Sequence, residues 1–387
     1  MKNLHQYVKS QPKTVSKILK NYNLCEYCAG RIISKIVAKP SSKFLGKKYN
    51  EKYGRVSNQK CYICKNIFCD FAPMLSNIIE KSSICDFKTF HLGIMIKPSL
   101  LERDDFIKSK FKIQGIENLK FSISKELAKK ISRKTNSRRV TDDPDLFIQA
   151  NFKDESCTLR TKPLYIYGRY NKKIRNLPQK QKRCRSCNGI GCHNCNFKGV
   201  MNIESVENTI SNFLIDKFDC KRIKINWIGG EDENSLVLGN GRPFFAQLLS
   251  PKKRNRILRK RFELQGIHLS ELRKLSIQPK GSISFKSQVS ITIETKKPVF
   301  STKLKKLKTL ETIFIKDFST NKKNNQKRIY KIDFKKTGKN RFVLDLFADG
   351  GIPIKSFIQN SSVKPNVSDL IENQCKCEKF DFRNIVI

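Results

Sequence analysis

Acidic residues are scarce in this chain, and long apolar runs are absent from it. The 387 residues include 34 Asp and Glu against 79 Lys and Arg, which gives a formal net charge of +45. So large an excess of cations, spread from end to end, indicates a polyanionic partner, and nucleic acid fits better than a membrane. A general lysine bias could supply part of the excess but hardly all of it.

No stretch approaches the roughly twenty consecutive apolar residues that a bilayer-spanning helix needs. The N-terminal sequence MKNLHQYVKSQPK also lacks the apolar core of a secretion signal. These absences exclude a membrane span and predict a cytoplasmic protein. Hydrophobic residues still make up 38% of the chain, enough to form two or three domains with cores, which excludes a disordered tail.

Fourteen cysteines are present, and eight of them form CxxC pairs. In a reducing compartment such pairs predict zinc ligands rather than disulfides. The first set contains two pairs about thirty residues apart and can supply four thiolates to one tetrahedral ion: Cys25, Cys28, Cys61 and Cys64. We expect this zinc to be structural, because a closed site has no open position for catalysis. Cys69 could substitute as a ligand, and unliganded or redox cysteines are the alternative.

A second and more compact set follows in the pattern CxxC-x4-CxxC: Cys184, Cys187, Cys192 and Cys195. Gly189 and Gly191 allow a tight reversal between its two pairs. Whether so short a loop lets all four thiolates bind one ion stays open at this point. We expect a second structural zinc, and therefore one or two zinc ions per chain.

Between the two cysteine sets, strand-like and helix-like patterns alternate. TFHLGIMIK, DPDLFIQANF and KPLYIYGRY predict strands, whereas LLERDDFIKSKF and SISKELAKKISRK predict helices, as in an α/β module. The run GRYNKKIRNLPQK then mixes an aromatic ring with cations, which suits base stacking and phosphate binding; its candidate RNA-binding residues are Arg169, Tyr170, Lys172 and Arg175. An ordinary solvated basic loop is an equally good explanation of this run.

The stretch WIGGEDENSLVLGNGRPFFAQLLSPKKR, residues 227–254, predicts turn, strand, turn and strand. Its two glycines place Glu231 and Asp232 at the rim of a sheet, where one of them could perform chemistry. Arg242 could hold a phosphate bidentately, and Lys253 and Arg254 lie in a cluster of cations suited to backbone phosphates. On pattern alone, however, ordinary hairpin turns with solvated acids explain the stretch better.

In the remainder of the chain, patterns typical of helices and of strands are again mixed. Residues 206–218 predict a helix, IKINW and SISFKSQVSITIET predict strands, and the basic residues 253–274 predict a loop or helical insertion that grips RNA. A solvated helix face is the alternative for that basic segment. Tyr330 is a candidate for stacking on a base, although a plain cross-strand tyrosine is as good an explanation.

These segments resemble, in order, the archaeal and eukaryotic tRNA pseudouridine synthase family conventionally called the tenth Pus type. The central stretch is similar to the family motif GREDVDVRMLGxGRPF, whose Asp after Glu is the nucleophile and maps to Asp232. This chain has Gly230 where the family has Arg. LCEYCAGR, DPD with GRYNKKIRNLPQ, and CNGIGCHNC with SVE resemble the family's zinc site, its THUMP-containing region and its second cysteine segment.

Near the C-terminus, GGIPIKSFIQNSSVKPNVSDLI resembles GGTYIKELISGDxGRTxPSVSELL, so that Ile354 and Lys355 match the family's Ile-Lys pair. Lys355 could therefore pair with Asp232 in place of the missing Arg, and a surface lysine is the simpler alternative. FSTNKKNNQKRIYKIDF is a degenerate form of the family's TPxRVxHRR run. By this resemblance, Tyr330 is the aromatic residue that stacks on the target base.

The resemblance implies an α+β protein: a pseudouridine synthase catalytic domain with a mixed, mainly antiparallel sheet, preceded by a THUMP-like α/β module and zinc knuckles. We expect an N-terminal zinc-binding region at 1–84, a THUMP-like module at 85–182, a second knuckle at 183–203 and a catalytic domain at 204–387.

The expected function is isomerisation of uridine to pseudouridine in the TΨC arm of tRNA, at position 54, position 55 or both. By resemblance the protein needs zinc for structure but no organic or nucleotide cofactor, and we expect a monomer that binds tRNA and no membrane. The alternatives are a catalytically inactive tRNA-binding protein or chaperone on the same scaffold, and a basic zinc protein associated with translation.

Overall fold

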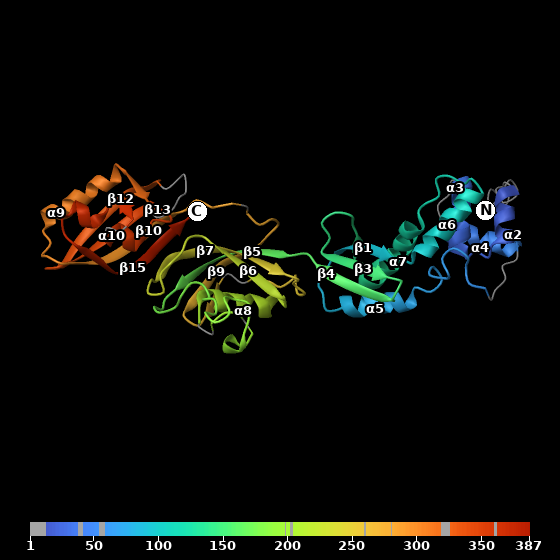
Figure 1. Cartoon of the computed structure of the whole chain (residues 1–387), viewed down its shortest axis with the longest axis horizontal. Coiled ribbons are helices and arrows are strands. Elements are labelled where there is room, and N and C mark those ends of the chain that lie inside the picture. Colours follow the sequence, from blue (N-terminus) through green and yellow to red (C-terminus); the bar gives the residue numbers. More distant parts are fainter. Residues whose placement is uncertain are drawn as a thin grey trace. The chain divides into compact units, whose positions relative to one another are not determined.

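The computed structural model describes residues 13–37, 42–53, 59–197, 199–201, 204–258, 261–279, 281–318, 326–359 and 362–387. The chain divides into two compact units, Met1–Lys162 and Pro163–Ile387, which we describe separately (Figure 1). None of the helices in these ranges is long and apolar enough to cross a bilayer.

The first unit joins a helical, cysteine-containing part to a small four-stranded sheet of order β2-β1-β3-β4. Strand β1 pairs in parallel with β2 and β3, and β4 is antiparallel to β3. Helices α5 and α7 contact each other and the strands, so they cover the same face of the sheet. The elements are α2 (Lys13–Asn21), α3 (Glu26–Val37), α4 (Ser42–Tyr53), α5 (Ala72–Ser82), β1 (Thr89–Met95), α6 (Pro98–Lys110), α7 (Leu119–Thr135), β2 (Arg138–Arg139), β3 (Leu146–Asn151) and β4 (Ser156–Thr161).

Helix α7 shows how the sequence produces this packing. Leu119, Ile123, Leu127 and Ile131 recur every four residues, and all four are buried. The Asn118 side chain accepts a hydrogen bond from the Lys120 amide at the helix start, and Asn136 ends the helix in the left-handed conformation.

The second unit is built on an eleven-stranded, mainly antiparallel sheet of order β14-β11-β12-β13-β10-β15-β7-β5-β9-β8, with β6 paired to β7. Strands β7 and β15 are parallel where Val237 meets Phe382. The elements are β5 (Leu164–Lys172), the 3-10 helix η1 (His193–Cys195), α8 (Val206–Phe218), β6 (Arg222–Trp227), β7 (Val237–Leu249), β8 (Arg261–Leu264), β9 (Ile267–Leu275), β10 (Lys286–Thr295), α9 (Ser301–Lys305), the 3-10 helix η2 (Lys306–Glu311), β11 (Phe314–Asp317), β12 (Gln326–Gly338), β13 (Arg341–Asp349), α10 (Ile354–Gln359), β14 (Val363–Lys364), α11 (Val367–Leu370) and β15 (Cys375–Val386).

These two units confirm the predicted fold class. The second unit carries the mixed sheet, and an α/β module with a cysteine cluster precedes it in the chain. The structural division falls at 162/163, earlier in the chain than the expected boundary at 182/183, because β5 pairs with β7 and β9 of the large sheet.

Two local predictions are wrong. The basic segment predicted as a loop or helical insertion contains the antiparallel hairpin β8–β9, which turns at Gln265 and Gly266, where Gly266 has a φ of +68°. The predicted turn at 239–241 lies inside the continuous strand β7, because Gly239 and Gly241 adopt positive φ there without ending the strand.

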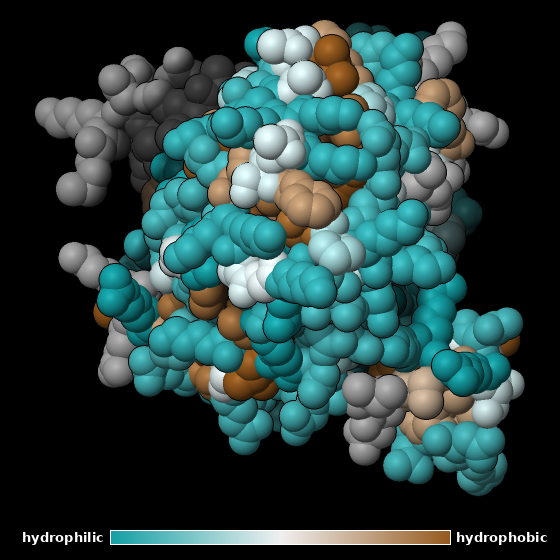
Figure 2. All heavy atoms as spheres, turned by 90° about the vertical axis from the view of Figure 1, so that its left-hand side faces the viewer, coloured by the Kyte–Doolittle hydropathy of each residue, from teal (hydrophilic) through white to brown (hydrophobic). Residues whose placement is uncertain are grey.

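Figure 2 shows a face of the second unit, the one that carries the C-terminal half of the large sheet. Hydrophilic side chains cover most of this face, and hydrophobic atoms gather in small patches between them. That surface agrees with a chain in which cations outnumber acids by more than two to one.

Candidate active site

The site is built around the loop that joins β6 to β7, residues 228–236. Gly229 has a φ of +75°, and a Cβ on it would lie 2.5 Å from Phe285 Cζ and 2.7 Å from Arg242 Nη1. A side chain is therefore excluded here both by conformation and by space. The loop then turns tightly, because the Ser235 amide donates to the Asp232 carbonyl at 3.0 Å.

Glu231 is fully buried, and two buried cations surround it. Its carboxylate lies 3.4 Å from Lys172 Nζ and 3.1 Å from Arg242 Nε, and none of the three side chains is exposed to solvent. Burying one carboxylate with two cations is tolerable only because each charge has an opposite partner. Burial lowers the pKa of Lys172, and Glu231 opposes that shift.

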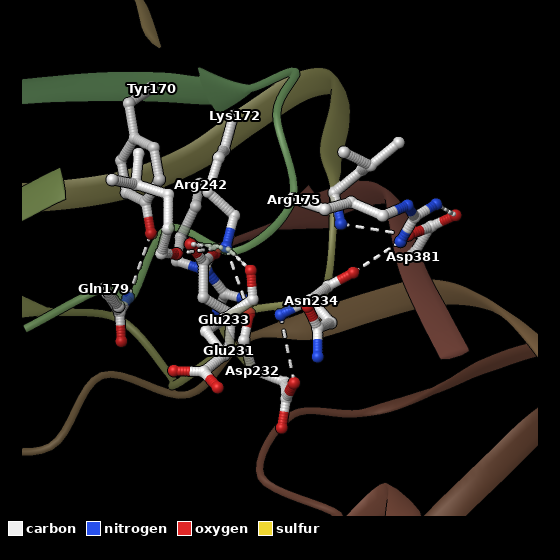
Figure 3. Close-up of polar contacts among 12 residues, drawn as sticks. Tyr170, Lys172, Arg175, Gln179, Glu231, Asp232, Glu233, Asn234, Arg242 and Asp381 are labelled. Carbon is white, nitrogen blue, oxygen red and sulfur yellow. Dashed lines mark hydrogen bonds and ion pairs between the residues drawn. The ribbon is translucent and has the colours of Figure 1, made fainter. Parts of the chain in front are cut away.

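Lys172 also fixes the backbone of the loop. Its ammonium group donates to the carbonyls of Leu177, Asp232 and Glu233 at 2.8, 3.0 and 3.2 Å. In Figure 3 these contacts converge on the Lys172 nitrogen, whereas the Asp232 side chain points away from it. The triad Lys172–Glu231–Arg242 therefore holds the loop from inside and leaves the Asp232 carboxylate outside.

A second clamp holds the far end of the same loop. Arg175 binds Asp381 of β15 through two hydrogen bonds of 2.8 Å and also donates to the Asn234 carbonyl (Figure 3). Asp381 in turn accepts from the Leu236 amide at 2.9 Å. The loop is thus fixed on both sides of Asp232.

Asp232 pairs with Lys355, the second residue of α10. Lys355 Nζ lies 2.7 Å from Asp232 Oδ2, and the Asn234 amide donates to Oδ1 at 3.0 Å. Partial burial raises the pKa of Asp232, but Lys355 and the Asn234 amide outweigh it, and the net pKa lies below the usual value. The same hydrogen bond raises the pKa of Lys355. The lowered pKa keeps the aspartate ionised at neutral pH, and its side chain is 26% exposed and therefore accessible.

A small pocket opens beside this pair. Gly230, two residues before Asp232, and Ile354, the residue before Lys355, both line it, together with Phe285, Ser287, Asp349 and Phe382. Arg242 also lines it, with its guanidinium 4.3 Å from the centre of the Phe382 ring. Arg242 Nη2 is buried and has no hydrogen-bond acceptor among the residues that the structure describes. The pocket thus combines apolar walls with one buried cation.

Tyr330 lies beside the same pocket. Its hydroxyl donates to Asp349 Oδ1 at 3.0 Å, and its side chain is exposed. The register between β12 and β13 shifts at Ile329/Lys331, so that Tyr330 occupies a bulge. The ammonium group of Lys286 lies 4.0 Å from the ring centre.

Three of the expected RNA-binding side chains lie inside the second unit. Arg169 is 8% exposed and donates to the carbonyls of Gly241 and Ile385, and Tyr170 and Lys172 are fully buried. The Tyr170 hydroxyl accepts a hydrogen bond from Gln179, and burial raises its pKa. This burial argues against a direct contact with RNA, and it gives the conspicuous basic run a structural role.

The basic segment after β7 is partly exposed. Lys253 and Arg254 are half-buried, and the Lys253 amide donates to the Phe218 carbonyl at 3.0 Å. The Arg254 carbonyl accepts from Lys274 Nζ at 2.6 Å, which links this segment to β9.

The first cysteine set converges as the spacing predicts. The Sγ atoms of Cys25, Cys28, Cys61 and Cys64 lie within 4.8 Å of one another, and the residues are completely buried. A tetrahedral zinc with Zn–S bonds of about 2.3 Å requires sulfur–sulfur distances of about 3.8 Å. The distance between Cys25 and Cys64 is 3.6 Å, so the group fits a zinc ion. Cys69 is exposed and is not one of the four.

The second cysteine set also converges, despite its short loop. Cys184–Cys192, Cys187–Cys195 and Cys192–Cys195 are each 3.8 Å apart between sulfur atoms. Backbone amides of Cys192 and Gly199 donate to Cys195 Sγ, and these bonds lower the pKa of that thiol to about 6. Both sets could hold a metal ion, and neither has an open position for catalysis.

Sequence reasoning missed the buried acids and their partners. The sequence places Glu231 at the rim of a sheet and singles out no role for Asp381, although each acid is paired with cations that fix the Asp232 loop. The available signal was the alternation in GRYNKK, which places Tyr170 and Lys172 on the same side of a strand.

Family models match both units. A model described as "Pus10, C-terminal" matches residues 165–386, more than half of the chain, and "Pus10 THUMP domain, archaeal" matches residues 75–151.

Full-length relatives are similar across both units. "tRNA pseudouridine synthase Pus10" of Nitrosopumilus maritimus is 39% identical over 96% of this chain and 97% of its own length. The protein of the same description from Cenarchaeum symbiosum is 30% identical over 95% and 91%. Among solved structures, a chain in an H/ACA RNP bound to a substrate RNA containing 2′-deoxyuridine is similar over 56% of this chain and 47% of its own, with 7% identity and a TM-score of 0.29.

Proposed function

Because the chain belongs to the Pus10 family of tRNA pseudouridine synthases, which are isomerases, we propose that it converts uridine to pseudouridine in the TΨC arm of tRNA with Asp232 as the nucleophile. The observation that supports this assignment is the ion pair between Asp232 and Lys355 at 2.7 Å, beside a pocket and on a loop clamped from both sides. The substrate positions are 54, 55 or both.

The reaction requires an ionised carboxylate next to an extruded base. Lys355 supplies the cation that keeps Asp232 ionised and takes the place of the family's Arg, which is Gly230 in this chain. Extruding the nucleotide costs a few kcal/mol of stacking, which contacts to the rest of the tRNA must offset. The basic surface suits such contacts.

Each side chain around the pocket then has a defined task. Asp232 attacks C6 of the uracil or C1′ of the ribose. The bond between N1 and C1′ breaks, the base rotates, a bond forms between C5 and C1′, and the bond to Asp232 breaks, which restores the free carboxylate. The proton lost from C5 is balanced by one gained at N1, so the isomerisation consumes no cofactor. Tyr330 stacks on the base and then assists removal of the C5 proton.

Three further kinds of contact complete the substrate site. Arg242 Nη2, which has no acceptor in the described part of the chain, donates to an oxygen of the bound nucleotide. Ile354 forms part of the apolar wall that excludes water from the reacting base. Lys253 and Arg254, on the segment after β7, neutralise backbone phosphates.

The two cysteine sets would each hold one structural zinc ion. When bound, each zinc cross-links its own knuckle and takes no part in the isomerisation. The thiolates of the first set tie the helix that begins at Glu26 to the segment around Cys61, and those of the second set close the loop before α8.

Unmodified tRNA transcripts test the proposal directly. The wild-type protein should form pseudouridine in the TΨC arm without added ATP or nucleotide, and Asp232→Ala should abolish conversion while tRNA binding stays nearly intact. Conversion by Asp232→Ala at the wild-type rate would remove the nucleophile assignment. Tight binding with no conversion by the wild type would instead identify a catalytically inactive tRNA-binding protein.

A further inference from the structure

The second cysteine knuckle, residues 184–197, exposes two apolar side chains, Ile190 and Phe197, and we call this part of the knuckle its tip. Ile190 is 90% exposed and Phe197 is 67% exposed. Scattered apolar residues are common on protein surfaces, so exposure alone indicates nothing. Ile190, however, lies on the loop between Cys187 and Cys192, and Phe197 follows Cys195 by two residues, in a knuckle that zinc rather than an apolar core would hold together.

The backbone at Phe197 is held in a conformation that a bulky residue rarely adopts. Its φ is +58°, and the left-handed region disfavours side chains other than glycine and, to a smaller degree, asparagine. The Phe197 amide donates to the Cys192 carbonyl at 2.9 Å, which fixes this geometry. The two residues after Cys64 and the two after Cys187 also have positive φ, so this conformation belongs to the cysteine turn itself, and glycine or asparagine would adopt it more easily than phenylalanine does.

The Phe197 ring has little to pack against. Its one ring contact in the described structure is with His193, at 4.8 Å between centroids and an interplanar angle of 64°. Because Phe197 is 67% exposed, this contact with one exposed imidazole leaves most of the phenyl ring open to solvent. A planar ligand could therefore stack on it.

The charges around the tip all have the same sign. Residues 180–203 contain no Asp or Glu, whereas Lys180, Lys182, Arg183 and Arg185 are exposed cations. Open aromatic rings among cations are the chemistry that binds unpaired nucleotides, since rings stack on bases while cations neutralise phosphates. A partner with a basic surface is excluded by the same charges.

The stem of the knuckle connects to the candidate active site. Arg183 and Val200 form an isolated β-bridge at its base, and Lys182 Nζ lies 3.6 Å from Glu233 Oε2. Glu233 directly follows Asp232. A nucleic acid whose target nucleotide lies at Asp232 thus passes close to the stem.

From this geometry we propose that Phe197 and Ile190 form a stacking platform for an unpaired nucleotide of the tRNA substrate, with Arg183 and Arg185 on the flanking phosphates. The proposal deepens the proposed function and rests on it, because it takes tRNA as the substrate. The knuckle is then a positioning device outside the pocket, and its residues touch no reacting atom.

Phe197→Asn separates this role from a structural one. Asparagine accepts the left-handed conformation, so the variant should melt no lower than the wild type and retain its zinc. Its affinity for tRNA should fall roughly five-fold or more, the loss expected from one base-stacking contact. Phe300→Asn is the matched control, because Phe300 is 62% exposed in the same unit but has an ordinary φ of −105°.

Binding to tRNA and to a blunt RNA duplex, measured over a range of salt concentrations, decides the question. Phe197→Asn should weaken tRNA binding without changing its salt dependence or its affinity for the duplex, whereas Arg185→Gln should reduce the salt slope. Equal tRNA affinity of Phe197→Asn and the wild type would overturn the proposal and leave the tip to a protein partner. If the wild type converts no uridine but Phe197→Asn still binds tRNA more weakly, the proposed function fails and the platform stands.

Discussion

At the scale of single residues, the charge on Asp232 depends on Lys355. The lysine ion pair is the main interaction that holds the pKa of the aspartate below its usual value, against the effect of burial. A group with a lowered pKa stays ionised until the pH falls through that lowered pKa, so the acid limb of the wild-type activity lies below the usual aspartate range.

Lys355→Met should therefore shift the acid limb of kcat/KM to higher pH, because the pKa of Asp232 rises once the cation is gone. The methionine keeps most of the side-chain volume, so tRNA binding at neutral pH should change little. The measurement is single-turnover pseudouridine formation between pH 4 and 8. Lys364→Met is the control, since Lys364 is also exposed and paired with an aspartate, Asp369, in the same unit. An unchanged acid limb in Lys355→Met would contradict the assigned role.

The buried triad permits a second prediction at this scale. Glu231→Gln leaves Lys172 and Arg242 buried without a counter-charge, and breaking a buried pair in this way typically costs about 3–5 kcal/mol of unfolding free energy. Glu233→Gln, two residues away and 50% exposed, should cost less than about 1 kcal/mol. Urea unfolding measures both. Equal effects of the two substitutions would show that the triad does not hold the loop.

Asp232 and Lys355 could be predicted as site residues from the sequence, because a resemblance between two motifs is recognised from residue types and their order alone. It could not show that Lys172 and Arg242 point into the core. A cation in a basic run is usually solvated, and only the folded structure brings Glu231 beside these two. Burial of charge is a property of the pair, and the members of this triad lie up to 70 residues apart, from 172 to 242.

At the scale of elements, regular spacing was predictable and irregular backbone was not. Helix α8 begins and ends at the predicted residues, because Val206, Ile210, Leu214 and Phe218 repeat every four positions and Ser205 caps the start. Strand β7 was predicted as two strands because Gly-Asn-Gly is typical of a turn. The structure keeps it as one strand with a bulge, because Val237 pairs with Lys172 of β5, Arg242 pairs with Tyr170, and residues 238–241 lie between them.

The cysteine sets provide the prediction for this scale. The wild-type protein should contain two zinc ions, and Cys28→Ser and Cys187→Ser should each contain one, because the two sets lie in different units and share no ligand. Chelation should unfold the N-terminal helices, where the first set is completely buried. Metal analysis with circular dichroism checks both statements, and one zinc per wild-type chain would refute the second site.

At the scale of the whole molecule, the excess of cations is larger than phosphate contacts at the candidate active site alone could use. Two units that both match family models, one described as a THUMP domain, share the net charge of +45. A protein of this kind binds its nucleic acid through many phosphate contacts outside the pocket. In the proposed reaction, those contacts provide the free energy needed to extrude the target nucleotide.

The affinity for tRNA should therefore fall steeply with salt, by at least about a hundred-fold between 50 and 200 mM, because each phosphate contact releases a condensed counterion. The tRNA affinity of Asp232→Asn should show the same dependence on salt concentration as that of the wild type, since in the proposed reaction this carboxylate contacts the target nucleoside and no phosphate. A double logarithmic plot of affinity against salt concentration gives the number of contacts as its slope. If binding is tight but nearly independent of salt, shape and stacking dominate recognition. The positive charge would then serve some purpose other than holding tRNA.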